Sequence, residues 1–258
     1  MRKSKVLAKL RAGHAARIFE TDDFLPAVPK LAAAFGYDGV WVDGEHRTFD
    51  PRETQMMIGF HHLADIDCIY RPPARDRTTL TRLLDAGATA VMVPLVNTAE
   101  EARQLVQATK FPPLGDRGYN GDSLDADFGL VSRKEYLAHA ASETCLVVQI
   151  ETPEAVANAD AIAAVPGVDV LFLGPADLSL RLPTSGSYHD PLFVEAQAQV
   201  AAAALRHRKA WGRPSRDPDD IQSLLAAGAR FVQYGTSSQA ILRHLRDCQS
   251  QLEAILME

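Results

Sequence analysis

The stretch Leu146–Ser179, LVVQIETPEAVANADAIAAVPGVDVLFLGPADLS, predicts a strand, a helix and a second strand. Its first apolar run ends in Glu151, and an amphipathic segment follows from Pro153 to about Val165. A second apolar run, Val168–Leu173, leads into a Gly-Pro-Ala turn that ends in Asp177. Short apolar runs bounded by turn residues are typical of parallel strands that are buried on both faces. One carboxylate therefore follows the C-terminal end of each predicted strand.

These two carboxylates predict a metal site. The C-terminal ends of parallel strands face the same way, so Glu151 and Asp177 are expected to converge. Two carboxylates with room for water suit a hard divalent cation such as Mg²⁺ or Mn²⁺. Taken singly, each has an ordinary explanation, because an acid is favoured at a helix N-terminus and Asp is common in turns and caps. Together with Gln149 and the Gly-Pro turn, the pair favours the metal.

Length and composition limit the class of protein. The chain has 258 residues, 47% of them hydrophobic, which is the usual size of one (β/α)₈ barrel and predicts a single domain over residues 1–258. The net charge of −6 contains no block of like charges, so we expect neither nucleic-acid nor membrane binding. Three widely spaced cysteines form neither a disulfide framework nor a zinc signature. With no apolar signal-peptide region or membrane-length run, we expect a cytoplasmic protein.

The same strand–helix rhythm extends over the whole chain. Eight runs of β character alternate with segments of helical periodicity, which predicts a parallel sheet and, for eight units, a closed α/β barrel. The predicted strands are Ala15–Phe19, Gly39–Val42, Cys68–Arg71, Ala90–Val96, Leu146–Ile150, Val168–Leu173, Ala210–Gly212 and Phe231–Tyr234. The predicted helices are Leu25–Phe35, Pro51–Leu63, Thr78–Ala86, Ala99–Ala108, Arg133–Ala141, Pro153–Val165, Leu192–Arg208, Pro218–Ala226 and Ser237–Met257.

Polar residues stand where four of these strands end, which is where barrels of this kind build their sites. His46 is the only one of eight histidines at such a position, and two acids, Asp43 and Glu45, shortly precede it. Arg71 ends another predicted strand. Its planar guanidinium group can bind the carboxylate of a substrate, or it can pair with Asp43 or Glu45 instead. Asp85 lies near the end of a helix, where an acid is unfavourable, so we expect it to have a specific partner.

Six motifs resemble the HpcH/HpaI aldolase family in order and spacing, from about residue 10 to about residue 245. The motifs are Asp43-Gly-Glu-His46, Leu84-Asp85-Ala-Gly, Val93-Pro-Leu-Val-Asn97, Phe111-Pro-Pro-Leu-Gly-Asp-Arg-Gly118, Gln149-Ile-Glu151 and Gly174-Pro-Ala-Asp-Leu178. The resemblance implies a barrel of the phosphoenolpyruvate/pyruvate type and a class II, metal-dependent pyruvate aldolase. The sequence departs from the family's pattern after His46, after the turn that ends in Asp177 and around Trp211. These departures leave the identity of the aldehyde undecided.

The resemblance also implies roles for individual residues. Glu151 and Asp177 would hold a divalent metal, Mg²⁺, Mn²⁺ or Co²⁺, and Gln149 would contact substrate oxygens. The turn of Gly174, Pro175, Ala176 and Asp177 would bind the pyruvate carboxylate through its backbone N–H groups.

Three further residues would carry the chemistry. His46 would be the general base, Asp85 would raise its basicity, and Arg71 would stabilise the enolate oxygen. The expected reaction is the reversible retro-aldol cleavage of a 4-hydroxy-2-oxo acid to pyruvate and an aldehyde.

Three alternatives stay open at this stage. A Schiff-base aldolase needs a lysine in the site, and none of the seven lysines follows a predicted strand. A CoA-thioester lyase of the citryl- or malyl-CoA type would share the metal carboxylates, although the motif around His46 fits the aldolases better. A non-catalytic barrel that binds an oxo acid would keep the site without turnover.

The last predicted helix, Ser237–Met257, carries a wide apolar face. It can close the barrel, or it can pack on another subunit. The resemblance favours the second, because these aldolases are typically homo-oligomers, often hexamers, whose last helix packs against a neighbour. We therefore expect a homo-oligomer in which this helix is exchanged between subunits.

Overall fold

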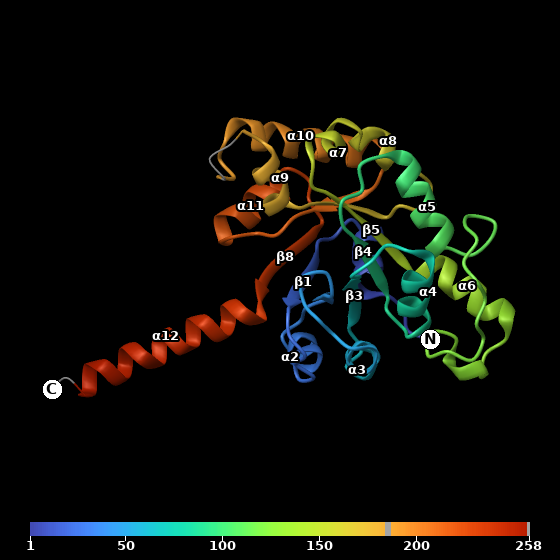
Figure 1. The fold of residues 1–258 in the computed structure, drawn as a ribbon, viewed down its shortest axis with the longest axis horizontal. Helices are drawn as coiled ribbons and strands as arrows, with labels where there is room; N and C mark the ends of the chain where they lie inside the picture. Colours follow the sequence, from blue (N-terminus) through green and yellow to red (C-terminus); the bar gives the residue numbers. More distant parts are fainter. Residues whose placement is uncertain (184–186, 257–258) are drawn as a thin grey trace.

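The computed structural model describes residues 1–183 and 187–256, and its centre is a sheet of eight parallel strands (Figure 1). The strand order is β7-β6-β5-β4-β3-β2-β1-β8, so that β7 and β8 meet at the seam of a nearly closed barrel. All eight predicted strands are confirmed. They are β1 (Ala16–Thr21), β2 (Gly39–Asp43), β3 (Asp67–Arg71), β4 (Ala90–Val93), β5 (Cys145–Ile150), β6 (Val170–Leu173), β7 (Ala210–Gly212) and β8 (Phe231–Thr236).

The seam between β7 and β8 is closed by a few backbone contacts. Pro214 and Gln233 form an isolated parallel bridge, and the Ser215 N–H donates to the Gln233 carbonyl at 2.9 Å. A Cβ added to Gly212 would lie 1.7 Å from the carbonyl oxygen of Phe231, so only glycine permits this approach. β7 therefore contacts β8 at Gly212 and, beyond its C-terminal end, at Pro214 and Ser215.

Helices surround the sheet (Figure 1). They are α1 (Lys5–Arg11), α2 (Val28–Ala34), α3 (Pro51–Leu63), α4 (Arg77–Asp85), α5 (Ala99–Thr109), α6 (Arg133–Glu143), α7 (Pro153–Ala157), α8 (Ala159–Ala163), α9 (Pro175–Arg181), α10 (Pro191–Arg206), α11 (Pro218–Ala226) and α12 (Ser237–Leu256). A 3₁₀ turn, η1, spans Asp127–Gly129.

The predicted helices differ from these in three ways. The prediction misses the seven-residue helices α1 and α9. The predicted helix 153–165 is two short helices, since the chain breaks at Asn158, whose side chain donates to the Asn97 carbonyl at 2.8 Å. The prediction also extends α12 to Met257, which lies outside the described residues.

One strand ends earlier than predicted, and this matters for the site. The prediction carries β4 to Val96, but β4 ends at Val93. Pro94 has no N–H to donate, and Leu95 adopts a left-handed φ of 54° that turns the chain. The Leu95 N–H is thereby freed from the sheet and donates to Glu151.

The core has an inner and an outer part, as expected when side chains alternate across a barrel wall. Trp41, Phe172 and Phe231 make edge-to-face contacts within a cluster that α1 joins through Val6 and Leu7. The larger cluster packs the other strand faces against the surrounding helices. The barrel is filled with side chains, so its chemistry must lie at an end.

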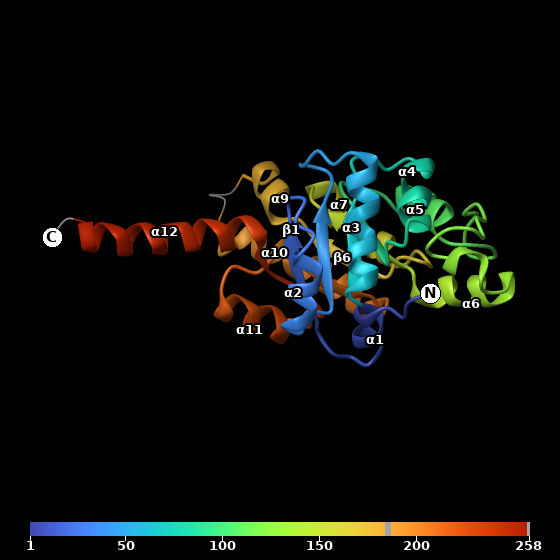
Figure 2. The ribbon, with the colours of Figure 1, turned by 90° about the horizontal axis from the view of Figure 1, so that it is seen from below.

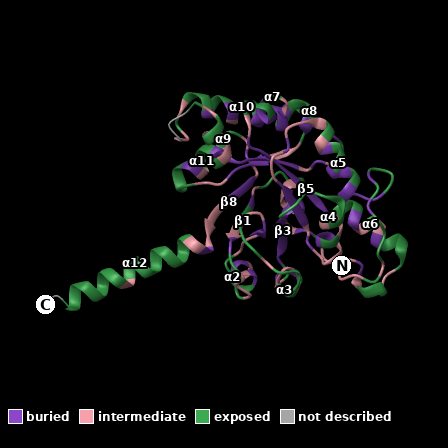
Figure 3. Ribbon diagram, in the orientation of Figure 1, coloured by how far each residue is buried: buried purple, intermediate pink, exposed green. Residues whose placement is uncertain are grey.

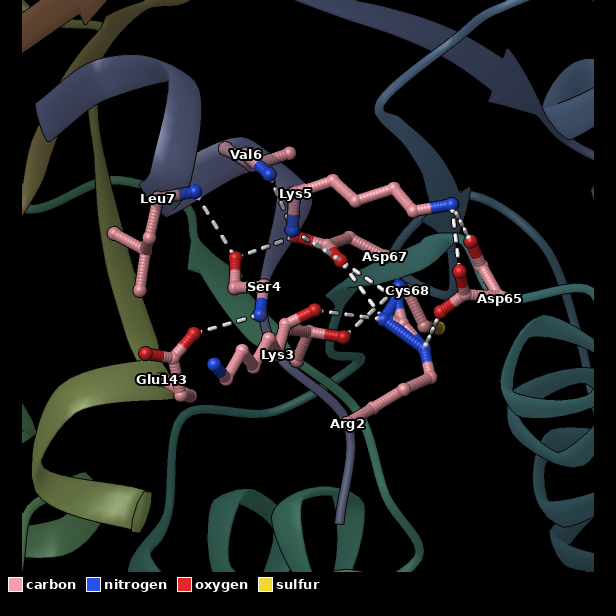
Figure 4. Close-up of polar contacts among 11 residues, drawn as sticks. Arg2, Lys3, Ser4, Lys5, Val6, Leu7, Asp65, Asp67, Cys68 and Glu143 are labelled. Atoms are coloured by element: carbon pink, nitrogen blue, oxygen red, sulfur yellow. Dashed lines mark hydrogen bonds and ion pairs between the residues drawn. The ribbon is translucent and has the colours of Figure 1, made fainter. Parts of the chain in front are cut away.

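A polar network ties the N-terminal segment to the beginning of β3 (Figure 4). Asp67 is fully buried, and its carboxylate accepts hydrogen bonds from the Arg2 guanidinium at 2.7 Å, the Ser4 hydroxyl at 2.5 Å and the N–H groups of Lys5 and Val6 at 3.1 and 3.0 Å. This end of the barrel is thus closed by α1.

α12 extends away from the barrel in both ribbon views (Figures 1 and 2). Only Ser237 at its start is buried, and the rest of the helix is almost entirely exposed (Figure 3). Among the described residues, no helix combines the length and apolar character needed to cross a membrane.

Candidate active site

The residue at the centre of the site is Glu151, directly after β5. Its carboxylate is buried and accepts hydrogen bonds from the Leu95 N–H at 3.0 Å and the Gln149 amide at 2.9 Å. A Cβ on Gly174 would lie 2.2 Å from Glu151 Oε1, so glycine is required for the β6 turn to approach. Burial raises the pKa of Glu151 to about 7, the Leu95 N–H opposes this, and the charge of Asp177 adds to it.

Asp177 lies in the first turn of α9, which Gly174 and Pro175 begin. Its side chain is about one third exposed, at 36%, and pairs with Arg181 one turn later. Its charge contributes to the raised pKa of Glu151, so the two carboxylates that the sequence predicts to converge lie at the same end of the barrel. Gly174 provides no side-chain cap, so the N–H groups of Ala176 and Asp177 face outward from an uncapped turn.

These residues fit a hard divalent cation. Glu151, Asp177 and Gln149 present oxygen donors, and the Gln149 Oε1 is buried without a hydrogen-bond partner among the described residues. Among the described residues, no group of three or more His, Cys, Asp or Glu side chains is arranged to hold a metal ion by itself. A cation held by the two carboxylates would take its other ligands from water or substrate, as Mg²⁺ commonly does.

Arg71 at the end of β3 is buried and held by two acids. Its Nε donates to Asp43 Oδ1 at 2.9 Å, and its Nη1 lies 3.0 Å from Glu45 Oε2. The guanidinium also lies over the Trp41 ring, 4.7 Å from its centroid. Burial alone would raise the pKa of Asp43, but Arg71 and the N–H groups of the following turn hold it below its ordinary value. Arg71 therefore forms both of the ion pairs considered from sequence, and they hold its guanidinium group at the C-terminal end of the barrel.

His46 lies on the open side of this cluster, with 62% of its side chain exposed. Its backbone N–H donates to Asp43 at 3.3 Å, and its Nε2 lies 3.7 Å from Glu45 Oε2. Glu45 thus stands between His46 and Arg71.

Asp85 has the specific partner that its helix position predicts. That partner is Arg117, whose Nη2 lies 2.7 Å away, with the Asn120 amide at 3.4 Å. Arg117 is fully buried and also contacts Asp125 and Tyr136. Within one chain the structure therefore pairs Asp85 with the connection after α5 and does not bring it to His46.

Sequence reasoning missed a further carboxyl at this end of the barrel. Glu20 lies near the end of β1, where burial raises its pKa to about 7, with Arg71 opposing and Asp43 adding to the rise. The rule that singled out Glu151, an acid where an apolar run ends, applies equally to Glu20. The predicted strand ends at Phe19, directly before Glu20, but the rule was applied to four other strands only.

A parallel barrel with carboxylates and a fixed arginine at its C-terminal end has the groups that a metal-assisted enzyme needs to stabilise negative charge on a substrate oxygen. Comparison with known proteins gives the family. Residues 24–243 match HpcH/HpaI aldolase/citrate lyase. The chain belongs to this family, and it is a pyruvate-type aldolase within it.

Three relatives illustrate the likeness. A 4-hydroxy-2-oxovalerate aldolase of Novosphingobium aromaticivorans is 38% identical over 83% of this chain and 80% of its own. A hydroxypyruvate/pyruvate aldolase of Pseudomonas aeruginosa is 39% identical over 86% and 82%. The crystal structure of an HpcH/HpaI aldolase/citrate lyase family protein from Burkholderia cenocepacia J2315 has a TM-score of 0.89 at 30% identity, covering 97% of this chain and 100% of that one.

Proposed function

We propose that this enzyme cleaves a 4-hydroxy-2-oxo acid into pyruvate and an aldehyde, and catalyses the reverse addition. The observation that carries the proposal is the buried Glu151 carboxylate, which accepts two hydrogen bonds and whose pKa is raised by burial and by the charge of Asp177. A buried acid left in this state is stabilised by a bound cation. When bound there, a divalent cation would supply positive charge to the oxygens of the 2-oxo acid.

The pyruvate half of the substrate would be oriented by the turn before α9. Its carboxylate would accept hydrogen bonds from the N–H groups of Ala176 and Asp177, and the buried amide of Gln149 would contact its oxygens. The close packing of Gly174 on Glu151 supports this arrangement, because it sets the turn directly beside the carboxylate.

His46 would act as general base and remove the proton of the 4-hydroxyl group. As C4–O becomes a carbonyl, the C3–C4 bond breaks and its electron pair passes into the pyruvate enolate. Arg71 would stabilise the enolate oxygen, which carries the negative charge. Return of a proton to C3 then gives pyruvate. Glu45, 3.7 Å from His46 and 3.0 Å from Arg71, would orient both groups.

Asp85 enters this scheme only through another subunit. Within the chain its carboxylate pairs with Arg117 and Asn120, and no hydrogen bond or ion pair joins it to His46 among the described residues. A role in raising the basicity of His46 would therefore require Asp85 of one molecule to meet His46 of another.

Deuterium exchange at C3 of pyruvate tests the proposal without knowledge of the aldehyde. In D₂O with Mg²⁺ or Mn²⁺ the enzyme should exchange the C3 protons, and chelation should stop the exchange while circular dichroism stays unchanged. A binding protein would show no exchange. Exchange that persists after chelation, together with a covalent enzyme–pyruvate adduct formed on borohydride reduction, would indicate a Schiff base and contradict the metal role.

We also propose that α12 packs on a second copy of the chain. Its exposed apolar residues are Ile241, Leu242, Leu245, Leu252, Ile255 and Leu256. An apolar cavity of about 250 Å³ lies at its base, lined from α2 by Leu31 and Phe35 and from β1 by Phe19. Two complementary apolar surfaces on one chain support a reciprocal exchange of α12, in a dimer or a hexamer built from dimers.

Light scattering tests the assembly. The full chain should have a mass at least twice the monomer's 28.1 kDa, and Leu245→Glu should lower it. Arg246→Glu, one residue on, is the matched control for an added charge on α12. A monomeric wild-type chain at micromolar concentration would contradict the proposal.

A further inference from the structure

A second cavity, which the proposed reaction does not use, opens above the seam of the barrel. It has a volume of about 280 Å³ and lies at the C-terminal ends of β7, β8 and β1. The lining residues that matter here are Glu20, Tyr188, Ser215, Arg216, Gln233 and Gln239. The cavity exists because β7 is only three residues long and contacts β8 through the bridge between Pro214 and Gln233.

The inner wall of this cavity carries a buried hydrogen-bond acceptor. Gln233 is 2% exposed, and its Nε2 donates to the Gly235 carbonyl at 3.0 Å. Its Oε1 accepts no hydrogen bond from any described residue. The Ser215 hydroxyl next to it already donates to the Gln233 carbonyl at 2.6 Å, so it too presents only lone pairs. An amide oxygen that has no protein partner beside a cavity is stabilised by a ligand that donates a hydrogen bond to it.

Glu20 connects the cavity to the candidate active site. Its half-buried side chain lines the cavity, and its charge interacts with Arg71 and Asp43. It makes no hydrogen bond with another described side chain. Glu20 is therefore a second acceptor, placed between the cavity and the arginine at which the enolate oxygen is expected.

The outer rim is positively charged but already occupied. The Arg216 guanidinium lies 4.6 Å from the centroid of the Tyr188 ring, and its Nη2 lies 3.1 Å from His189 Nε2. Its Nε is 3.9 Å from Asp220. The cavity thus presents the hydrogen-bond acceptors of Gln233 and Glu20 inside, and at its edge the Arg216 guanidinium, whose charge is partly offset by Asp220.

We propose that this cavity binds the hydroxyl-bearing chain of the aldehyde, with Gln233 Oε1 and Glu20 accepting hydrogen bonds from its hydroxyl groups. The inference rests on the proposed function and specifies its substrate class as hydroxylated aldehydes. An apolar aldehyde would displace water from both acceptors without donating a hydrogen bond to either, and sites built to hydrogen-bond a substrate hydroxyl discriminate against such analogues. An aldehyde with a terminal carboxylate would place a second negative charge against Glu20.

The test compares three aldehydes in the addition of pyruvate with Mg²⁺ present: glyceraldehyde, propionaldehyde, which has the same number of carbons, and succinic semialdehyde. The wild-type kcat/KM should be about 100-fold higher for glyceraldehyde than for propionaldehyde. Gln233→Leu should lower the glyceraldehyde value at least tenfold and leave propionaldehyde and C3 exchange unchanged. Gln222→Leu, on the exposed face of α11, is the matched control and should change none of them.

Glu20→Leu provides a second variant in case Gln233→Leu does not fold. It should lower kcat/KM for glyceraldehyde about tenfold and raise that for succinic semialdehyde. The inference would be overturned if the ratio of kcat/KM for glyceraldehyde to kcat/KM for propionaldehyde were the same in the wild type and in the folded variants. The proposed reaction would still be supported in that case, provided that the wild type exchanges the C3 protons of pyruvate. Loss of C3 exchange in the wild type would overturn both.

Discussion

The two ends of the barrel each bury a carboxylate, and they treat it differently. Asp67 at the N-terminal end receives hydrogen bonds from one guanidinium, one hydroxyl and two backbone N–H groups (Figure 4). Glu151 at the C-terminal end receives only two. Burial raises the pKa of both carboxylates, but at Glu151 the charges of Asp177 and Glu45 add to the rise. A fully paired buried charge holds a fold in place, whereas one left short of partners is available for a ligand. The predictions below test this division between the two ends.

The largest effect is expected at the C-terminal end. Glu151→Ala or Asp177→Ala should reduce lyase activity by at least about 10³-fold, because the positive charge that stabilises the enolate would be lost. Thermal unfolding should be little changed, since neither carboxylate is fully paired. Isothermal titration with Mn²⁺ should show lost binding in both variants. Glu154→Ala, exposed in α7, is the control, and substantial activity in either variant would contradict the metal assignment.

His46→Ala should lower kcat by about 10²–10⁴-fold, the usual contribution of a general base. Pyruvate affinity should hardly change, because His46 lies on the open side of the cluster. Steady-state kinetics with His14→Ala as the control measures both quantities. If pyruvate binding disappears while turnover at saturation survives, His46 is a binding residue.

At the N-terminal end the same kind of substitution should act on stability. Asp67→Ala should lower the free energy of unfolding by about 3 kcal/mol, because it removes the acid that pairs with Arg2 and caps the start of α1. Asp65→Ala, whose side chain is 66% exposed, should cost less than about 1 kcal/mol. Urea unfolding measures both. Equal losses in the two variants would mean that the network around Asp67 does not hold this end together.

The smallest effect concerns pH. His61 in α3 is fully buried, and burial lowers its pKa to about 4, below the ordinary value of 6.5. The unfolded chain therefore binds a proton at this residue between pH 6.5 and 4 that the folded chain does not, so stability falls as the pH falls through this window. Between pH 8 and pH 5 the loss should be about 2 kcal/mol. His61→Leu should flatten this part of the curve, and His14→Ala, on the surface, should leave it as it is.

The alternation of strands and helices could be predicted because each period is local in sequence. One exception has a local physical cause that periodicity does not register. β4 stops at Val93 because of Pro94 and the left-handed Leu95. The seven-residue helices α1 and α9 are missed as well. These exceptions also build the site, since the Leu95 N–H binds Glu151 and α9 carries Asp177.

The site could be predicted in part by the same reasoning. Glu151 and Asp177 follow β5 and β6 at the same end of the barrel, as expected, because the direction of parallel strands is fixed. The partner of Asp85 could not be foreseen, since Arg117 lies 32 positions away in a connection without regular structure. The position of Glu45 between Arg71 and His46 likewise depends on how one turn folds over the end of β2.

The separation of α12 from its own barrel has a consequence for mixed populations of chains. A chain truncated before Ser237 would still offer the apolar surface of α2 and β1, but it would have no helix to give in return. Under the proposed exchange, such a chain added in excess should capture the helix of an intact chain and leave that chain's own surface uncovered. Truncated chains would then act as dominant inhibitors of assembly, even though their barrels and strand-end carboxylates are complete.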